Sequence, residues 1–231
     1  MDEIKVYFIV SDIHSFYSIF RKSLENAGFD INNDNHILIV CGDIWDRGNE
    51  SKELYIFLRY ELPPHRRILI RGNHEYLLKD ICNKKQIDRY DYSNGTARTI
   101  ANLLDVDYDD MFYQYGKVYS YNEHTNLEYP EFIRLIINDL INSPYVEWLF
   151  SDDWVDYYEL NDKYIFVHSF IPLIANDTLP MYYVENRNLS YFPEWRTNAT
   201  RIEWEEATWG CLINYLFKDY LIKKLKMETT L

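Results

Sequence analysis

Hydrophobic runs and helical patterns alternate over the first third of the chain. Short β-branched runs at residues 6–10, 37–40 and 68–70 are typical of buried strands. Between them, apolar residues recur at helical spacing and predict helices over residues 15–27 and 51–60. This order of strand, helix, strand, helix, strand predicts parallel strands joined by right-handed crossovers.

The pattern changes after the third strand. From residue 76 to residue 147 the apolar spacing becomes helical, apart from a polar, tyrosine-rich stretch at residues 88–95 that is typical of a loop. Strand patterns return at residues 154–160 and 164–167, and the Asn-Asp-Lys sequence at residues 161–163 predicts a hairpin turn between them. We therefore predict an α/β fold with a mostly helical insertion at about residues 76–147.

Length and charge narrow the class of protein. A chain of 231 residues is long enough for a sizeable core, and we expect a single domain over residues 1–231. The net charge of −13 argues against a general nucleic-acid-binding surface, which needs clustered Lys and Arg. A phosphorylated substrate stays compatible with this charge, because bound divalent cations reverse the local field of an acidic site.

Nothing in the composition indicates export or a membrane. The N-terminus lacks the basic and long apolar regions of a signal peptide, and no run approaches the length of about 18 apolar residues that a membrane span needs. The three widely spaced cysteines, Cys41, Cys82 and Cys211, form no zinc or disulfide pattern. We expect reduced thiols, a cytoplasmic protein and no membrane partner.

A short block of residues with candidate metal-binding or catalytic side chains follows each of the three predicted strands. Asp12-Ile13-His14 follows the first strand, Gly-Asp-Ile-Trp-Asp-Arg-Gly follows the second at residues 42–48, and Gly-Asn-His-Glu follows the third at residues 72–75. Open α/β sheets build their sites at such strand ends. Carboxylate, imidazole and amide groups there predict a metal centre.

Together these blocks resemble those of the calcineurin-like metallophosphoesterases. The likeness covers residues 4–80 well and returns near His168. The Arg-Gly-Asn-His-Glu form at residues 71–75 is most similar to the protein serine/threonine phosphatase branch, since the dinucleoside-tetraphosphatase branch usually has Asp at position 75. The resemblance implies two packed mixed β-sheets flanked by helices, in a four-layer sandwich.

The resemblance also implies a two-metal site and its ligands. Two divalent ions, Mn²⁺ first with Fe, Zn or Ni as the other choices, would activate a bridging water that attacks the phosphorus of a phosphate monoester. Asp43 matches the carboxylate that bridges the ions. The full set of implied metal ligands is Asp12, His14, Asp43, Asn73 and His168.

Three further residues match the catalytic groups of the family. Arg47 resembles its phosphate-binding arginine, since a planar guanidinium suits two phosphate oxygens. His74 matches the acid that protonates the leaving alkoxide, and Asp46 matches the carboxylate that orients this histidine.

The C-terminal part departs from the family. The family has a late Gly-His block whose histidine completes the second metal site, but no histidine follows His168, and Gly210 is followed by Cys211. Residues 212–226 have an amphipathic helical pattern instead, so we expect incomplete C-terminal strands. A truncated or frameshifted gene is our first explanation; a second chain that completes the site and a lineage that lost the activity are the others.

The sequence thus predicts a metal-dependent phosphoesterase that acts on a phosphorylated protein or small molecule, including phosphoserine and phosphothreonine. One alternative is a truncated or inactive family member that acts as a binding protein. Another is a dinucleoside-polyphosphate hydrolase or nuclease. The acidic charge and Glu75 count against the second alternative, and we expect no nucleic-acid partner.

Overall fold

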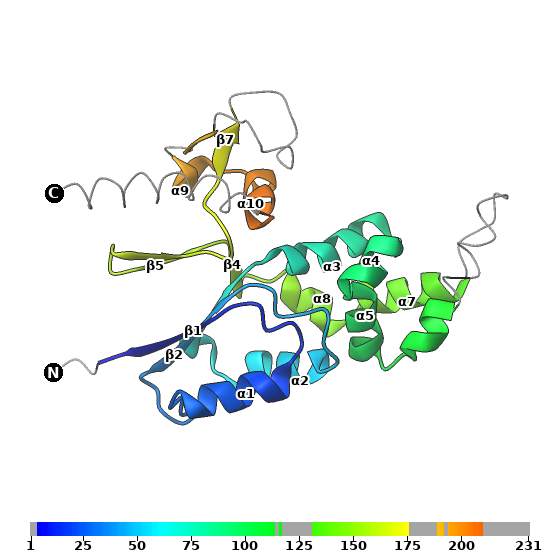
Figure 1. Cartoon of the computed structure of the whole chain (residues 1–231), viewed down its shortest axis with the longest axis horizontal. Helices are drawn as coiled ribbons and strands as arrows, with labels where there is room; N and C mark the ends of the chain where they lie inside the picture. Colours follow the sequence, from blue (N-terminus) through cyan, green and yellow to red (C-terminus); the bar gives the residue numbers. More distant parts are fainter. Residues whose placement is uncertain (1–3, 114–115, 117–130, 176–188, 192–193, 210–231) are drawn as a thin grey trace, which may run out of the picture. The chain divides into compact units, whose positions relative to one another are not determined.

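The computed structural model describes residues 4–113, 116, 131–175, 189–191 and 194–209 (Figure 1). The chain divides into two compact units, residues 1–168 and residues 169–231, and each is described by itself. Gly210, Cys211 and the amphipathic pattern at residues 212–226 lie outside the described residues.

The first unit is built on a parallel sheet with the strand order β1-β2-β3-β4. Its β-branched runs form the strands because such side chains fit a pleated, buried surface. The register places Val10 beside Val40 and Cys41 beside Ile70, so that β1, β2 and β3 end at one edge. The strands are β1 (Val6–Val10), β2 (His36–Cys41), β3 (Arg67–Ile70) and β4 (Trp154–Val155).

Both faces of this sheet are covered, as the alternation along β2 illustrates. Leu38 and Val40 belong to the main core, whereas Ile39 and Cys41 face a smaller apolar cluster on the other side. The main core also holds apolar side chains of α1 (Tyr17–Asn26) and α2 (Ser51–Ile56). Each fully buried aliphatic side chain contributes about 1.5–3 kcal/mol to folding, so the sheet that carries the strand-end loops is firmly held.

The second predicted helix ends in an unexpected way. It extends as α2 only to Ile56 and continues as a π-helical turn, η1 (Phe57–Glu61), in which the amide of Leu62 donates to the carbonyl of Phe57. A short 3₁₀ turn, η2 (Pro64–Arg66), then leads into β3.

Helices occupy the described residues between β3 and β4, where they lie together in Figure 1. Helix α5 contacts both α2 and α3, which ties this group to the loops at the strand ends. The helices are α3 (Asn73–Lys84), α4 (Arg89–Asn94), α5 (Thr96–Leu104), α7 (Glu131–Ile141) and α8 (Pro144–Leu149).

The prediction of a loop at residues 88–95 is wrong, because helix α4 forms there. The Asp88 side chain accepts the amides of Tyr90 and Asp91, and the Asp91 side chain accepts the amide of Asp88. This capping box satisfies the first-turn amides, and Tyr92 is buried against the core. Gly95, at φ +94°, then breaks the chain between α4 and α5.

The strand predicted at residues 154–160 is divided in two. Its first part is β4, which pairs with β3, and its second part is β5 (Tyr158–Leu160), which pairs antiparallel with β6 (Tyr164–Phe166). Tyr158 and Phe166 pack on the smaller apolar cluster of the parallel sheet. The predicted hairpin turn is confirmed, with the left-handed φ values of Asn161 (54°) and Asp162 (55°) that such turns favour.

The described part of the second unit is small. It contains β7 (Leu173–Ala175), which pairs antiparallel with β8 (Leu189–Tyr191), and helices α9 (Trp195–Asn198) and α10 (Arg201–Thr208). Thr200 caps α10, and the rings of Trp195 and Trp204 meet edge to face at 5.7 Å. These elements and the first unit confirm the predicted α/β class. None of the helices in the described part of the chain has the length and apolar character that crossing a membrane requires.

Candidate functional site

The candidate site lies in the loops that follow β1, β2 and β3. Backbone hydrogen bonds join these loops, from the amide of Asp12 to the carbonyl of Gly42 at 3.2 Å and from the amide of His14 to the carbonyl of Asp43 at 2.9 Å. The amide of Gly48 donates to the carbonyl of His14 at 2.9 Å. These bonds interlock the first two blocks, and the third block joins them through the side chain of Glu75, which accepts the amides of Asp43 and Ile44.

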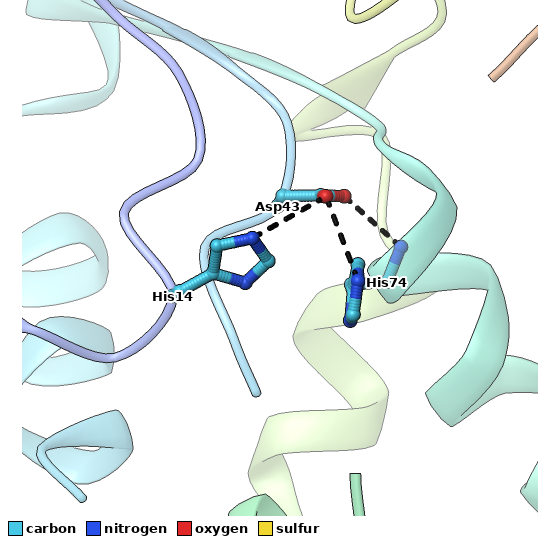
Figure 2. Close-up of side chains that lie close together, drawn as sticks. All are labelled: His14, Asp43 and His74. Carbon is cyan, nitrogen blue, oxygen red and sulfur yellow. Dashed lines mark hydrogen bonds and ion pairs between the residues drawn. The ribbon is translucent and has the colours of Figure 1, made fainter. Parts of the chain in front are cut away.

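The carboxylate of Asp43 is the centre of this structure. It is buried, and Figure 2 shows one of its oxygens joined to the imidazoles of both His14 and His74, and the other joined to the backbone nitrogen of His74. Oδ2 lies 3.7 Å from Nε2 of His14 and 3.8 Å from Nε2 of His74. Oδ1 accepts the backbone amide of His74 at 3.0 Å. These three residues present ligand atoms close enough to one another to hold one metal ion.

His14 presents an unprotonated nitrogen to this centre. Its Nδ1 lies 2.9 Å from the carbonyl oxygen of Trp45, which can only accept a hydrogen bond, so Nδ1 carries the proton. Burial lowers the pKa of His14, so the ring is neutral and the Nε2 lone pair is free. This buried Nε2 has no hydrogen-bond partner in the described structure, and the half-exposed carboxylate of Asp12 lies 3.8 Å from it. A buried lone pair beside two carboxylates is the environment of a cation ligand.

A second group of ligand atoms faces the other oxygen of Asp43. Nδ1 of His168 lies 2.8 Å from the carbonyl oxygen of Cys41, so its proton is on Nδ1 as well. Nε2 of His168 then lies 3.0 Å from Oδ1 of Asn73 and 3.5 Å from Oδ1 of Asp43. Three electron pairs converge there, an arrangement that a cation would stabilise.

The ligand atoms at the site are also arranged so that they could hold two ions at two separate positions. Oδ2 of Asp43 faces His14, whereas Oδ1 faces His168 and Asn73. A carboxylate whose two oxygens serve two ligand groups can bridge two divalent ions.

The backbone of the first two blocks is strained. Residues other than glycine rarely adopt positive φ, because their Cβ approaches the backbone closely. Six of the ten such residues in the described structure belong to these two loops. They are Asp12, His14, Ser15, Asp43, Asp46 and Arg47. Strain of this kind is concentrated at functional sites, where the surrounding structure holds it.

His74 and Asp46 form a buried acid pair beside the metal ligands. Nδ1 of His74 lies 2.6 Å from Oδ2 of Asp46, whose side chain is fully buried. Burial lowers the pKa of His74, but the hydrogen bond and charge of Asp46 outweigh it, together with the charges of Asp43 and Glu75, so that the pKa is raised. The Asp46 carboxylate therefore favours the protonated imidazole, the form that a general acid needs.

Arg47 places a cation next to this acid pair. The residue is exposed, and its Nη2 lies 3.4 Å from Nε2 of His74. A guanidinium in this position can bind an incoming anion beside the acid pair.

All eight residues predicted from the sequence are thus connected in one site through the contacts given above. Two kinds of residue were missed. The sequence indicates for Glu75 only a branch of the family and no place in the site. Its buried carboxylate nevertheless accepts the amides of Gly72, Asp43 and Ile44 at 2.6–2.9 Å. Burial and the charge of Asp43 raise the pKa of Glu75 to about 7 despite these bonds. Thr96 and Thr99 of α5, which bind Asp46, had no signal in the sequence.

Gly72 is required by the close approach of the second and third loops. A Cβ there would lie 2.2 Å from Oδ1 of Asp43 and 2.6 Å from its amide nitrogen. We expect Gly72→Ala to lower the free energy of unfolding by about 1–3 kcal/mol, as overpacking does, in a denaturant titration. Gly116→Ala is the control, since nothing lies within 4 Å of a Cβ at that position. Equal stability of the two variants would contradict this close packing.

Comparison with known proteins agrees with these observations. A family model described as calcineurin-like phosphoesterase matches residues 6–218. A comparison with curated proteins finds no match to the chain.

Proposed function

The chain belongs to the calcineurin-like phosphoesterases, and from this premise we propose that it hydrolyses phosphate monoesters, including phosphoserine and phosphothreonine. The family makes it a hydrolase that depends on divalent metal ions, and His14 and Asp43, two members of the His14–Asp43–His74 cluster, are placed to hold one. The choice of monoesters, and of the serine/threonine phosphatase branch, rests on the Arg-Gly-Asn-His-Glu sequence at residues 71–75.

One observation carries the proposal: the two oxygens of Asp43 face two separate sets of possible ligand atoms. Asp12 and His14 would hold the first ion, and Asn73 and His168 the second, with Asp43 shared. When bound, two such ions lower the pKa of water for nucleophilic attack and neutralise phosphate oxygens. The second set is rich in oxygen, which suits Mn²⁺ among the candidate metals.

The remaining residues bind and protonate the substrate. Arg47 would bind two phosphate oxygens and hold the phosphorus in place. Nε2 of His74 would give its proton to the leaving oxygen, while Asp46 keeps the ring oriented and stabilises its charge. We assign His74 to this role rather than to metal binding, because Asp46 holds its Nδ1 at 2.6 Å, the arrangement of an acid and the carboxylate that orients it.

One specific observation favours a second candidate, a family member that binds a phosphorylated ligand without turning it over. Residues 169–231 contain no histidine to match the family's late Gly-His block, and Gly210 is followed by Cys211. The buried His74–Asp46 pair supports the enzyme instead, since binding alone has no use for a proton donor.

Hydrolysis of p-nitrophenyl phosphate by the full chain tests the proposal. We expect turnover with added Mn²⁺, loss of turnover after chelation and dialysis, and recovery when Mn²⁺ is returned, because the ions supply the nucleophile. A phosphopeptide, diadenosine tetraphosphate and bis-p-nitrophenyl phosphate then separate the branches. Faster turnover of either of the last two would overturn the assignment to monoesters. Tight phosphate binding without turnover would favour the second candidate.

A further inference from the structure

Asp46 is held by a helix that the sequence motifs do not include. Its side chain is 0% exposed, and among the described residues its carboxylate accepts three hydrogen bonds. One comes from His74, and the other two come from hydroxyl groups of α5: Thr99 donates to Oδ1 at 2.8 Å and Thr96 donates to Oδ2 at 2.7 Å. A buried carboxylate needs such partners, because it has lost its water.

Thr99 holds the backbone of Asp46 as well as its side chain. The amide of Asp46 donates to Oγ1 of Thr99 at 2.9 Å, while the same hydroxyl donates its proton to Oδ1. Asp46 has a φ of 74°, a strained conformation that persists only where the surroundings hold it. Both carboxylate oxygens are therefore fixed, and Oδ2 remains directed at Nδ1 of His74.

The start of α5 is shaped for this contact. Thr96 and Thr99 are three positions apart and so lie on one face of the helix, and both are fully buried. Gly95 precedes them, and a Cβ there would lie only 2.4 Å from the amide nitrogen of Arg47. The helix can approach the loop this closely because that position has no side chain.

We propose that Thr96 and Thr99 are positioning residues that orient the Asp46–His74 pair for protonation of the leaving group. This inference rests on the proposed function. It assigns the insertion between β3 and β4 a part in the chemistry: its hydroxyl groups set the direction of the acid through their hydrogen bonds to Asp46.

Leaving groups of different basicity test the proposal. Phenolate needs a proton to depart, whereas p-nitrophenolate leaves readily without one. We expect Thr96→Val and Thr99→Val each to lower kcat for phenyl phosphate about 10-fold or more, and kcat for p-nitrophenyl phosphate less than about 3-fold, because each removes a hydrogen bond to a charged group and Thr99→Val also removes the acceptor of the Asp46 amide. The KM values should change little, since the phosphate group is bound elsewhere.

The serine variants are the matched controls. Thr96→Ser and Thr99→Ser keep the hydroxyl and should keep kcat on both substrates, whereas a loss equal to that of the valine variants would overturn the proposal in favour of simple packing. Equal losses on the two substrates, or none, would also overturn it. If Thr99→Val does not fold, Thr96→Val decides, because within the described residues the Thr96 hydroxyl bonds to the carboxylate of Asp46 and not to its backbone.

A spectroscopic measurement separates this inference from the proposed function. The Nδ1 proton of His74, in its 2.6 Å hydrogen bond, should resonate far downfield in the proton NMR spectrum of the metal-free chain. We expect Thr96→Val to move this resonance and Thr96→Ser to leave it in place. An unmoved resonance in Thr96→Val would overturn the positioning role even if the enzyme is active. Wild-type inactivity on both substrates would instead overturn the proposed function.

Discussion

Asp43→Asn is expected to lower kcat/KM for p-nitrophenyl phosphate by about 10³-fold or more in the presence of Mn²⁺. Asparagine has the same size, and its one oxygen can still accept the amide of His74. It removes the negative charge, however, and leaves a single oxygen where two oxygens face the His14 and His168 sides of the site. We expect the bound metal to fall together with the activity.

Asp139→Asn makes the same chemical change at an exposed position of α7 and serves as the control. It should keep wild-type activity and metal content. Circular dichroism of both variants shows whether the fold is retained. If folded Asp43→Asn kept more than about a tenth of the activity, the shared-carboxylate assignment would be wrong.

His74→Asn is expected to separate proton donation from metal binding. We predict that kcat for phenyl phosphate falls about 10²-fold, with a smaller loss for p-nitrophenyl phosphate, because only the first leaving group depends strongly on an acid. The backbone amide that His74 donates to Asp43 is retained in this variant. The ions should therefore bind as in the wild type, as measured by metal content or calorimetry.

The contrast between the two variants makes this prediction decisive. If His74→Asn lost metal as Asp43→Asn does, His74 would be a ligand of the His14–Asp43–His74 cluster rather than the acid. His65→Asn, at an exposed histidine of η2, controls for the loss of an imidazole elsewhere.

The sequence predicted those residues of the site that lie within the three short blocks at the strand ends. The three blocks each follow a strand directly, so parallel pairing alone brings Asp12, Asp43 and Asn73 to one edge. His168 came only through the family resemblance, and its contact with Asn73 joins residues 95 positions apart. No local pattern indicates such a contact.

The wrong prediction at residues 88–95 and the two threonines that were missed also have physical causes. Residues 88–95 are polar and rich in tyrosine, which is typical of a loop, but the Asp88 cap and the burial of Tyr92 stabilise α4 instead. Thr96 and Thr99 are ordinary helix residues until the fold brings them to Asp46, about 50 positions earlier. Tertiary contacts decided both cases.

The left-handed backbone of the two loops has a consequence for how this chain can change over generations. A residue other than glycine at positive φ lowers the free energy of unfolding by roughly 1 kcal/mol relative to a relaxed backbone. Glycine at the same position would restore much of that stability. A descendant that no longer used the chemistry would thus gain stability by exchanging His14, Asp43 or Arg47 for glycine. We therefore expect these side chains to be kept only in chains that use them.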